Sequence, residues 1–271
     1  MVPSSSKKQG FRRGIYILPT LFTIGTIFCG FYAVTNAAKG EFNLAAIALG
    51  FAVVFDGMDG KIARMTNSSS EFGVQVDSLA DVVTFGLAPS LLAYFWGLQT
   101  LSLVSPYSQH VQQIGWIVCF GFLVCGVMRL ARFNIQSGQP DRAGRFSQKP
   151  FVGMPIPAGA AMVAAVVHFS PKPIDYWVVG ALWNVLVAFL AYLMVSTIKY
   201  PSFKHIDLKS RKRYVSVLLL SMIVALIYHY SEIVLLILAT TYVCSGIFLK
   251  IARFDKTKAR KCVDLGQPHD G

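Results

Sequence analysis

Four aspartates are the residues of this chain whose types and spacing could do chemistry. Asp56 and Asp59 are three residues apart, and Asp77 and Asp81 are four apart, so each pair would share one face of a helix. Long apolar segments flank the run on both sides. Ionisable groups at membrane depth are costly and usually mark a functional site. Converging carboxylates also repel one another unless a cation lies between them, so the spacing predicts a metal site.

The residues beside the acids indicate which substrate groups would bind next to the metal. With a polar turn at 65–72, two antiparallel helices bring both acid pairs to similar depths, since Asp56 lies ~12 Å deeper than Arg64 and Asp81 lies ~12 Å deeper than Gly73. An all-oxygen set of carboxylates suits Mg²⁺ or Mn²⁺. Gly60 and Gly73 lie on the acid-bearing faces and would let a flat group approach the backbone. Arg64 offers a forked cation for a phosphate. The set predicts a site for metal, diphosphate and a planar base.

Two other interpretations account for part of this pattern. The carboxylates could be structural partners of Lys61, Arg64 and Arg129, but four acids would need more buried cations than the two helices supply. A cation channel or transporter with an acidic filter would explain the carboxylates and the apolar chain. It would not explain the glycines on the acid-bearing faces or the nearby arginine.

The elements that must position the acids are membrane-spanning helices. Of the 271 residues, 54% are hydrophobic and only 14% charged, against about a quarter charged in a soluble domain. The expected fold is an all-α, polytopic integral membrane protein of about eight transmembrane helices, with a six-helix core and a C-terminal hairpin that turns at 228–231. The predicted spans are 15–36, 43–64, 73–96, 113–134, 154–170, 175–198, 214–230 and 232–250.

The charge distribution predicts how the chain is oriented. The net charge is +12, yet of the 25 Lys and Arg residues only Lys39 and Lys172 fall in outer segments if the N-terminus is inside. This predicts a multi-pass protein of the cell (inner) membrane with both termini and the acid site facing the cytoplasm. Basic and aromatic residues do not interleave as in nucleic-acid binding, so no nucleic-acid partner is expected. The four tryptophans (Trp96, Trp116, Trp177 and Trp183) are typical of interfacial belts or lipid packing.

At this point the chain resembles a known family. The pattern Asp-x2-Asp-Gly-x2-Ala-Arg-x8-Gly-x3-Asp-x3-Asp, which begins at Asp56, is the signature of the CDP-alcohol phosphotransferases, and every position matches. Segments 16–30, 129–134 and 151–157 resemble the bacterial and archaeal phosphatidylserine synthase branch. The resemblance covers roughly residues 11–200, and beyond that only the general layout of the last two helices. Apolar runs and charge divide the chain into a basic N-terminal segment at 1–14, a catalytic core at 15–200, a basic loop and two-helix hairpin at 201–254, and a polar tail at 255–271.

The resemblance also implies residue roles. Asp56 and Asp77 would bridge two metal ions, Mg²⁺ or Mn²⁺, while Asp59 would complete one site and Asp81 the other. Asp81 would also be the general base, although a carboxylate that touches a metal is a weak base and could mainly orient the hydroxyl. The residues expected to contact CDP-diacylglycerol are Gly60, Arg64, Ser70, Gly73, Thr20 and Thr23. Family members often have asparagine where this chain has Thr20 and Thr26, but a threonine hydroxyl can still donate to a phosphate or to cytosine.

The implied reaction transfers a phosphatidyl group from CDP-diacylglycerol to the hydroxyl of L-serine, giving phosphatidylserine and CMP. The protein would carry it out in contact with membrane lipid. Glycerol 3-phosphate or inositol phosphate would also suit a basic pocket, and the resemblance at 129–134 and 151–157 favours serine. The candidates for binding the acceptor, at the inner end of the fourth span or in the following loop, are Arg129, Arg132, Asn134, Gln136 and Lys149. Family resemblance also implies a homodimer.

Overall fold

The computed structural model describes residues 7–66, 71–99, 101, 106–138, 153–198 and 200, and then 221–222, 225–227, 229–246, 248 and 250. No strand occurs among them. The elements are α1 (Lys7–Ala38), α2 (Phe42–Thr66), α3 (Glu71–Asp81), the π-helical segment η1 (Val82–Leu87), α4 (Ala88–Tyr94), the π-helical segment η2 (Phe95–Gln99), α5 (Pro106–Gly138), α6 (Ile156–Phe169) and α7 (Trp177–Val195). A further helix spans 229–246.

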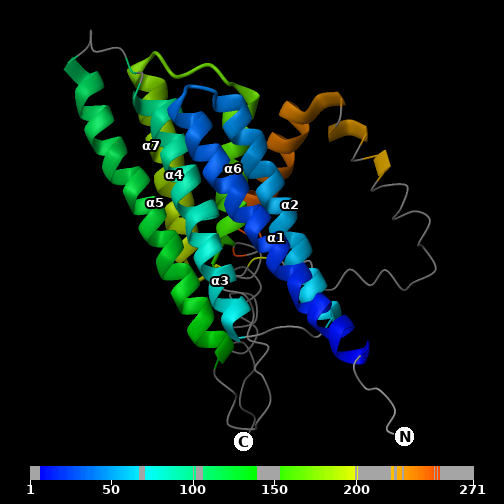
Figure 1. The fold of residues 1–271 in the computed structure, drawn as a ribbon. Coiled ribbons are helices and arrows are strands. Elements are labelled where there is room, and N and C mark those ends of the chain that lie inside the picture. Colours follow the sequence, from blue (N-terminus) through cyan, green and yellow to red (C-terminus); the bar gives the residue numbers. More distant parts are fainter. Residues whose placement is uncertain are drawn as a thin grey trace, which may run out of the picture.

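The long helices form a bundle of roughly parallel and antiparallel rods (Figure 1). Five helical stretches of the described part are long and apolar enough to cross a membrane: Thr20–Ala38, Phe42–Ile62, Phe72–Gln99, Tyr107–Ile135 and Trp177–Val195. These correspond to five of the expected spans and confirm a polytopic all-α protein. The expected span at 154–170 is the shorter apolar helix α6, of 14 residues. Most of the expected span at 214–230 lies outside the described residues, so the total of eight stays a prediction.

The first two helices are joined by a tight turn. Gly40, with φ of +83°, adopts a left-handed conformation that favours glycine. The backbone N–H groups of Lys39 and Glu41 both donate to the carbonyl of Asn36, at 3.1 and 2.9 Å. The turn brings α2 back along α1, and the two helices pack through small buried side chains at Ala33, Ala37, Ala45, Ala48 and Ala52.

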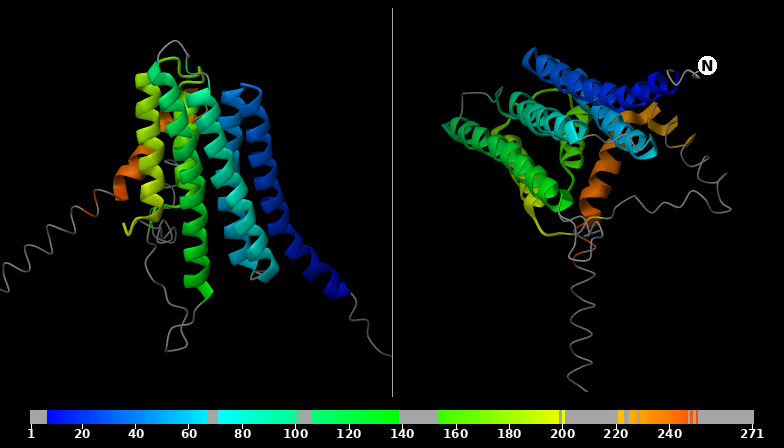
Figure 2. Two further views of the ribbon diagram at one scale, coloured as in Figure 1. Left: turned by 90° about the vertical axis from the view of Figure 1, so that its left-hand side faces the viewer. Right: turned by 60° about the horizontal axis from the view of Figure 1, so that its bottom comes forward.

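Residues 71–99 form one continuous helix whose backbone register changes immediately after Asp81, where η1 begins. This helix lies between α1 and α5 (Figure 2). The side chain of Thr84 in η1 donates to the carbonyl oxygen of Thr26 at 3.1 Å. Opposite it, a Cβ added to Gly30 would lie 2.7 Å from Thr84 Oγ1. A glycine is therefore required where α1 approaches η1, just beyond the second acid pair.

The proline-containing segment before α6 is held against the end of α7. The Gly153 N–H donates to the carbonyl of Ile198 at 2.8 Å, and the Met154 N–H to that of Leu193 at 3.1 Å. Gly153 has φ of +89°, and a Cβ there would lie 2.5 Å from the Met194 carbonyl oxygen. Pro155 then precedes the first turn of α6, where proline is well tolerated.

The expected position of the tryptophans at interfaces or against lipid is wrong for two of the four. Trp96 and Trp183 are buried, each 4% exposed, and pack edge to face at 4.9 Å. Their indole N–H groups donate to the carbonyls of Ser170 and Ala93, at 2.9 and 3.0 Å, so these residues are internal cross-links rather than interfacial anchors. Residues 229–231 are also helical, where the sequence predicts a turn.

Candidate metal and diphosphate site

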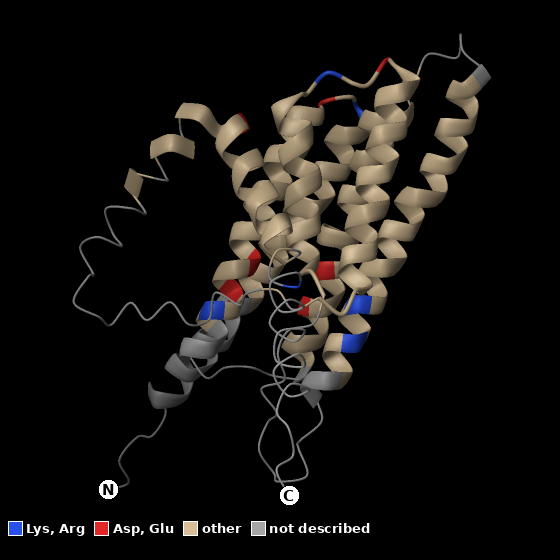
Figure 3. Ribbon diagram, turned by 180° about the vertical axis from the view of Figure 1, so that it is seen from behind, with Lys and Arg blue, Asp and Glu red and all other residues tan. Residues whose placement is uncertain are grey.

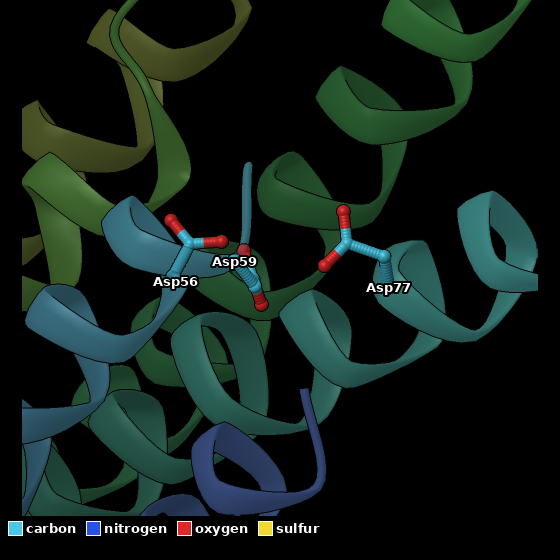
Figure 4. Close-up of side chains that lie close together, drawn as sticks. All are labelled: Asp56, Asp59 and Asp77. Carbon is cyan, nitrogen blue, oxygen red and sulfur yellow. The ribbon is translucent and has the colours of Figure 1, made fainter. Parts of the chain in front are cut away.

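Three of the four aspartates converge between α2 and α3. Asp56 and Asp59 lie on the last turns of α2, and Asp77 faces them from α3 (Figure 4). One carboxylate oxygen from each residue lies within 4.8 Å of the other two. Asp59 is buried, and the other two are half-buried. The spacing of three and four residues therefore does bring carboxylates from two helices to one point, as the sequence predicts.

Asp81 lies one turn beyond Asp77, at the junction with η1. Its carboxylate is outside the three-residue cluster but interacts electrostatically with Asp56, Asp77 and Asp59. It comes within hydrogen-bonding reach of Asp56. Its Oδ1 atom is buried and has no hydrogen-bond partner in the described part of the structure. A buried carboxylate oxygen in this condition can take a proton or a cation.

Groups from α1 and α2 surround the Asp59 carboxylate. The buried Thr23 hydroxyl donates to Asp59 Oδ2 at 3.4 Å, and the backbone N–H of Gly60 also donates to that carboxylate. A Cβ added to Gly60 would meet nothing within 4 Å, so the space above its backbone is open. Thr20 is exposed, one turn before Thr23. Gly73 lies one turn before Asp77 on α3. Ser70 and the side chain of Arg64 lie outside the described residues.

The acceptor candidates on α5 have different environments. Arg129 is 8% exposed and interacts electrostatically with Asp81. Asn134 donates from Nδ2 to the hydroxyl of Ser78 at 3.0 Å, which ties α5 to α3 between the acids of the second pair. Arg132 is exposed on the bundle surface. Lys149 and the side chain of Gln136 lie outside the described residues.

The charged residues of the described part gather at the two ends of the bundle, with an uncharged length between them (Figure 3). The acid cluster is at the end where α1 begins. Near the cluster, Arg129 acts on Asp81, whereas Lys61 is exposed. Among the side chains that the structure describes, these two cations do not balance four carboxylates, which weighs against a purely structural role for the acids.

The donor set fits a divalent metal ion. Three convergent carboxylates offer oxygen ligands, the kind that Mg²⁺ and Mn²⁺ prefer. Asp81 Oδ1, which no described group contacts by a hydrogen bond, lies next to them and offers a further ligand. Sequence reasoning missed Ser78, which Asn134 contacts. This contact joins residues far apart in the chain, which no local pattern could have indicated.

The fold and the site define a class: a polytopic, all-helical membrane protein with a carboxylate-rich site for a divalent cation near one end of the bundle. Residues 16–198, most of the chain, match the sequence model of the CDP-alcohol phosphatidyltransferase family. The chain belongs to this family. The matched segment contains all four aspartates and ends in the residues that follow α7.

Relatives in several bacteria carry one name, CDP-diacylglycerol–serine O-phosphatidyltransferase. The chain is 37% identical over 195 residues to that of Helicobacter pylori strain ATCC 700392 / 26695, covering 71% of this chain and 75% of the relative. It is 36% identical over 187 residues to that of Bacillus subtilis strain 168, covering 69% and 91%. It is 34% identical over 193 residues to that of Mycobacterium tuberculosis strain ATCC 25618 / H37Rv, covering 69% and 62%.

Proposed function

We propose that this protein transfers the phosphatidyl group of CDP-diacylglycerol to the hydroxyl of L-serine, giving phosphatidylserine and CMP. The observation that carries the proposal is the convergence of Asp56, Asp59 and Asp77 within 4.8 Å, inside the segment that matches the family. The names of the relatives support serine as the acceptor.

The carboxylates would hold two divalent ions, Mg²⁺ or Mn²⁺. Asp56 and Asp77 would ligate both, Asp59 one of them and Asp81 the other. Bound ions would neutralise charge on the diphosphate and on the departing CMP. The chain's own groups orient the acids: the Thr23 hydroxyl and the Gly60 N–H both donate to Asp59.

The CDP group would lie over the open backbone face at Gly60, where a side chain would otherwise project into free space. Gly73 would give a second close approach from α3. We assign the phosphate and nucleotide contacts to Arg64, Ser70 and the hydroxyls of Thr20 and Thr23. In the chain these residues belong to α1, to the last turns of α2 and to the position before α3. Since the Thr23 hydroxyl donates its one proton to Asp59, it would meet the nucleotide as an acceptor.

Asp81 would take the proton of the acceptor hydroxyl. The hydroxyl oxygen attacks the phosphorus that bears diacylglycerol, the bond from this phosphorus to the CMP oxygen breaks, and CMP leaves with the electron pair. The buried oxygen of Asp81, which has no hydrogen-bond partner in the described part, supports this assignment. We expect Asp81→Asn to lower turnover by about 10²- to 10⁴-fold, since it keeps the shape and removes the base. Near-normal turnover in Asp81→Asn would remove the base assignment.

On the acceptor side, L-serine is a zwitterion and needs a cation for its carboxylate. Arg129 is the candidate best placed for this, because it is buried beside Asp81. Asn134 lies between the helices at Ser78 and is a candidate partner for the ammonium group. Arg132, Gln136 and Lys149 remain candidates for binding the acceptor alcohol as it enters the site.

The charge distribution supports a membrane orientation, and the family resemblance supports an oligomeric state. We propose that the protein lies in the cell (inner) membrane with both termini and the acid site on the cytoplasmic side, because Lys39 and Lys172 alone carry positive charge on the other side. We also propose a homodimer, by resemblance to the family. A mass measurement of the protein in nanodiscs tests the dimer, and a monomeric mass at full activity would contradict it.

The decisive experiment measures CMP release by the purified protein from CDP-diacylglycerol. Release that requires both L-serine and Mg²⁺ or Mn²⁺, and that stops when a chelator is added, is the expected result. CMP release with glycerol 3-phosphate or inositol phosphate, but not with L-serine, would keep the chemistry and reject serine. No release with any alcohol would reject the transferase activity. Asp56→Asn serves as the inactive control, because it removes an acid assigned to both ions.

A further inference from the structure

A pair of polar side chains joins α3 to α5 at the end of the bundle that holds the acids. The two helices lie side by side there (Figure 1). The amide of Asn134 on α5 faces the hydroxyl of Ser78 on α3: Nδ2 lies 3.0 Å and Oδ1 3.4 Å from Ser78 Oγ. Both side chains are half-buried. Both ends of the amide are within reach, so the hydroxyl decides which one it bonds.

The single proton of the Ser78 hydroxyl is already in use. Ser78 Oγ donates to the carbonyl oxygen of Val74 at 3.0 Å, one turn back on α3. A hydroxyl has one proton and two lone pairs, so Ser78 meets Asn134 as an acceptor and takes the hydrogen bond from Nδ2, the nearer atom. If the amide turned over, two oxygens would face each other unless the bond to Val74 broke. Ser78 therefore fixes the polarity of the amide and leaves Asn134 Oδ1 without a donor from this hydroxyl.

The pair lies next to the acid assigned to the acceptor hydroxyl. Ser78 is three residues before Asp81 on one continuous helix, and such residues are neighbours with roughly 5–6 Å between their Cβ atoms. L-Serine carries its hydroxyl and its ammonium group on adjacent carbon atoms. With the hydroxyl at Asp81, the ammonium group can approach Asn134. An ammonium group has only donors, and an amide oxygen only accepts, so the fixed polarity matches an amine and not the oxygens of a phosphate.

We propose that Ser78 is a positioning residue that fixes the amide of Asn134 with its oxygen available to the ammonium group of the acceptor, so that the pair favours an aminated alcohol. The inference rests on the proposed function, which gives Asn134 the ammonium group. Ser78 acts through Asn134 and need not touch either substrate. Its effect should therefore be confined to the acceptor, leaving the binding of CDP-diacylglycerol and of metal unchanged.

The test compares Ser78→Ala with wild type in nanodiscs. We expect KM for L-serine to rise about threefold to tenfold, the effect of losing one hydrogen bond. KM for CDP-diacylglycerol and the Mn²⁺ concentration that gives half-maximal rate should change less than twofold. Ser78→Thr keeps the hydroxyl and should restore KM for L-serine to within about twofold of wild type. Ser90→Ala is the matched control, because the Ser90 hydroxyl on α4 donates only to its own turn, at the carbonyl of Leu87. Melting temperatures show whether each variant keeps its fold.

Two further measurements separate positioning from a general structural effect. Asn134→Ala should raise KM for L-serine about tenfold or more, since it removes a hydrogen bond to a charged group. Adding Ser78→Ala to Asn134→Ala should then raise it less than twofold further, because Ser78 acts only through the amide. The second probe is 3-hydroxypropionate, which is L-serine without the ammonium group, as a competitor of phosphatidylserine formation. Its inhibition constant should be the same in Ser78→Ala and wild type to within about twofold.

The failures can be told apart. If wild type releases CMP with L-serine but Ser78→Ala leaves KM for L-serine unchanged, the positioning role is rejected and the proposed function stands. The same holds if the effects of Ser78→Ala and Asn134→Ala multiply in the double variant, or if Ser78→Ala weakens 3-hydroxypropionate as much as L-serine. If wild type uses only alcohols without an amine, both serine and the role of Ser78 are rejected, while the transferase chemistry stands. If wild type releases no CMP with any alcohol, both proposals are rejected.

Discussion

The Thr23 hydroxyl connects the first helix to the acid cluster through one contact, its donation to Asp59 Oδ2. A donor to a ligating carboxylate fixes the direction of its lone pairs, and loss of such a partner commonly weakens metal affinity by about 10- to 100-fold. The 3.4 Å length of this bond places Thr23 toward the lower end of that range. A residue outside the acidic motif can therefore set how much metal the site needs.

Thr23→Val keeps the shape of the side chain and removes the donor. We expect the Mn²⁺ concentration for half-maximal CMP release to rise about 10-fold, while the rate at saturating Mn²⁺ changes little. The measurement is a metal titration of activity. Thr35→Val is the matched control, because the Thr35 hydroxyl on the same helix donates only to its own turn, at the carbonyl of Tyr32. Equal metal dependence in both variants would contradict this role for Thr23.

The spacing of the acids was sufficient to predict their meeting, because positions three and four residues apart share a helix face whatever else the fold does. It did not predict the separate position of Asp81, outside the closest cluster. Thr23 appeared among the candidates only by resemblance, and Ser78 did not appear at all. Contacts between helices depend on how each helix is rotated about its axis, and one sequence does not specify that rotation.

At the scale of the elements, the approach of α1 to η1 sets where the second acid pair lies. Gly30 and Thr84 meet with no room for a side chain between them, and Thr84 donates to the α1 backbone. Hydropathy predicts that residues 73–96 form one span, but it carries no signal for the change to π-helical hydrogen bonding after Asp81. It also overestimates α6, since Met154 and Pro155 are apolar yet not helical.

Gly30→Ala should push α1 away from η1. A Cβ at this position would lie 2.7 Å from Thr84 Oγ1 and 2.9 Å from its Cα, and a backbone atom cannot turn aside. We expect a loss of about 1–3 kcal/mol of stability, as for other overpacked interiors. Gly50→Ala is the control, because a Cβ there meets nothing within 4 Å. It should be neutral or stabilising by up to about 1 kcal/mol. Denaturant unfolding in detergent measures both, and equal stability of the two variants would contradict the close approach.

The helix at 229–246 depends on His168 for its attachment near the end of the bundle opposite the acid cluster. His168→Ala removes contacts to both Asn43 and Ser231. We expect amide hydrogen exchange in 229–246 to speed up by about tenfold or more, the effect of losing one to two hydrogen bonds. Exchange in α2 beyond its first turns should not change. His110→Ala, at an exposed histidine of α5, should leave 229–246 as in wild type. Unchanged exchange in His168→Ala would mean that other contacts hold the helix.

For the whole molecule, the orientation in the membrane is the property that charge predicts and geometry does not. Lys39 lies in the α1–α2 turn, and Lys61 lies near the acid cluster at the other end of α2; both are exposed. The experiment uses spheroplasts, in which the layers outside the cell membrane are removed and the cell membrane stays sealed. We expect a membrane-impermeant maleimide to label Lys39→Cys in them above the wild-type background. Lys61→Cys should be labelled only after the membrane is permeabilised. The reverse pattern would invert the topology and place the acid site outside.

The metal-binding half of the site is local in sequence, because Asp56 to Asp81 belong to the consecutive helices α2 and α3. The acceptor candidates Arg129 and Asn134 come from α5, much later in the chain. The metal-binding half and the acceptor half can therefore diverge separately. A lineage could change the alcohol that it uses by altering α5, while the α2–α3 pair, and with it the handling of the CDP-linked donor, remained as it is.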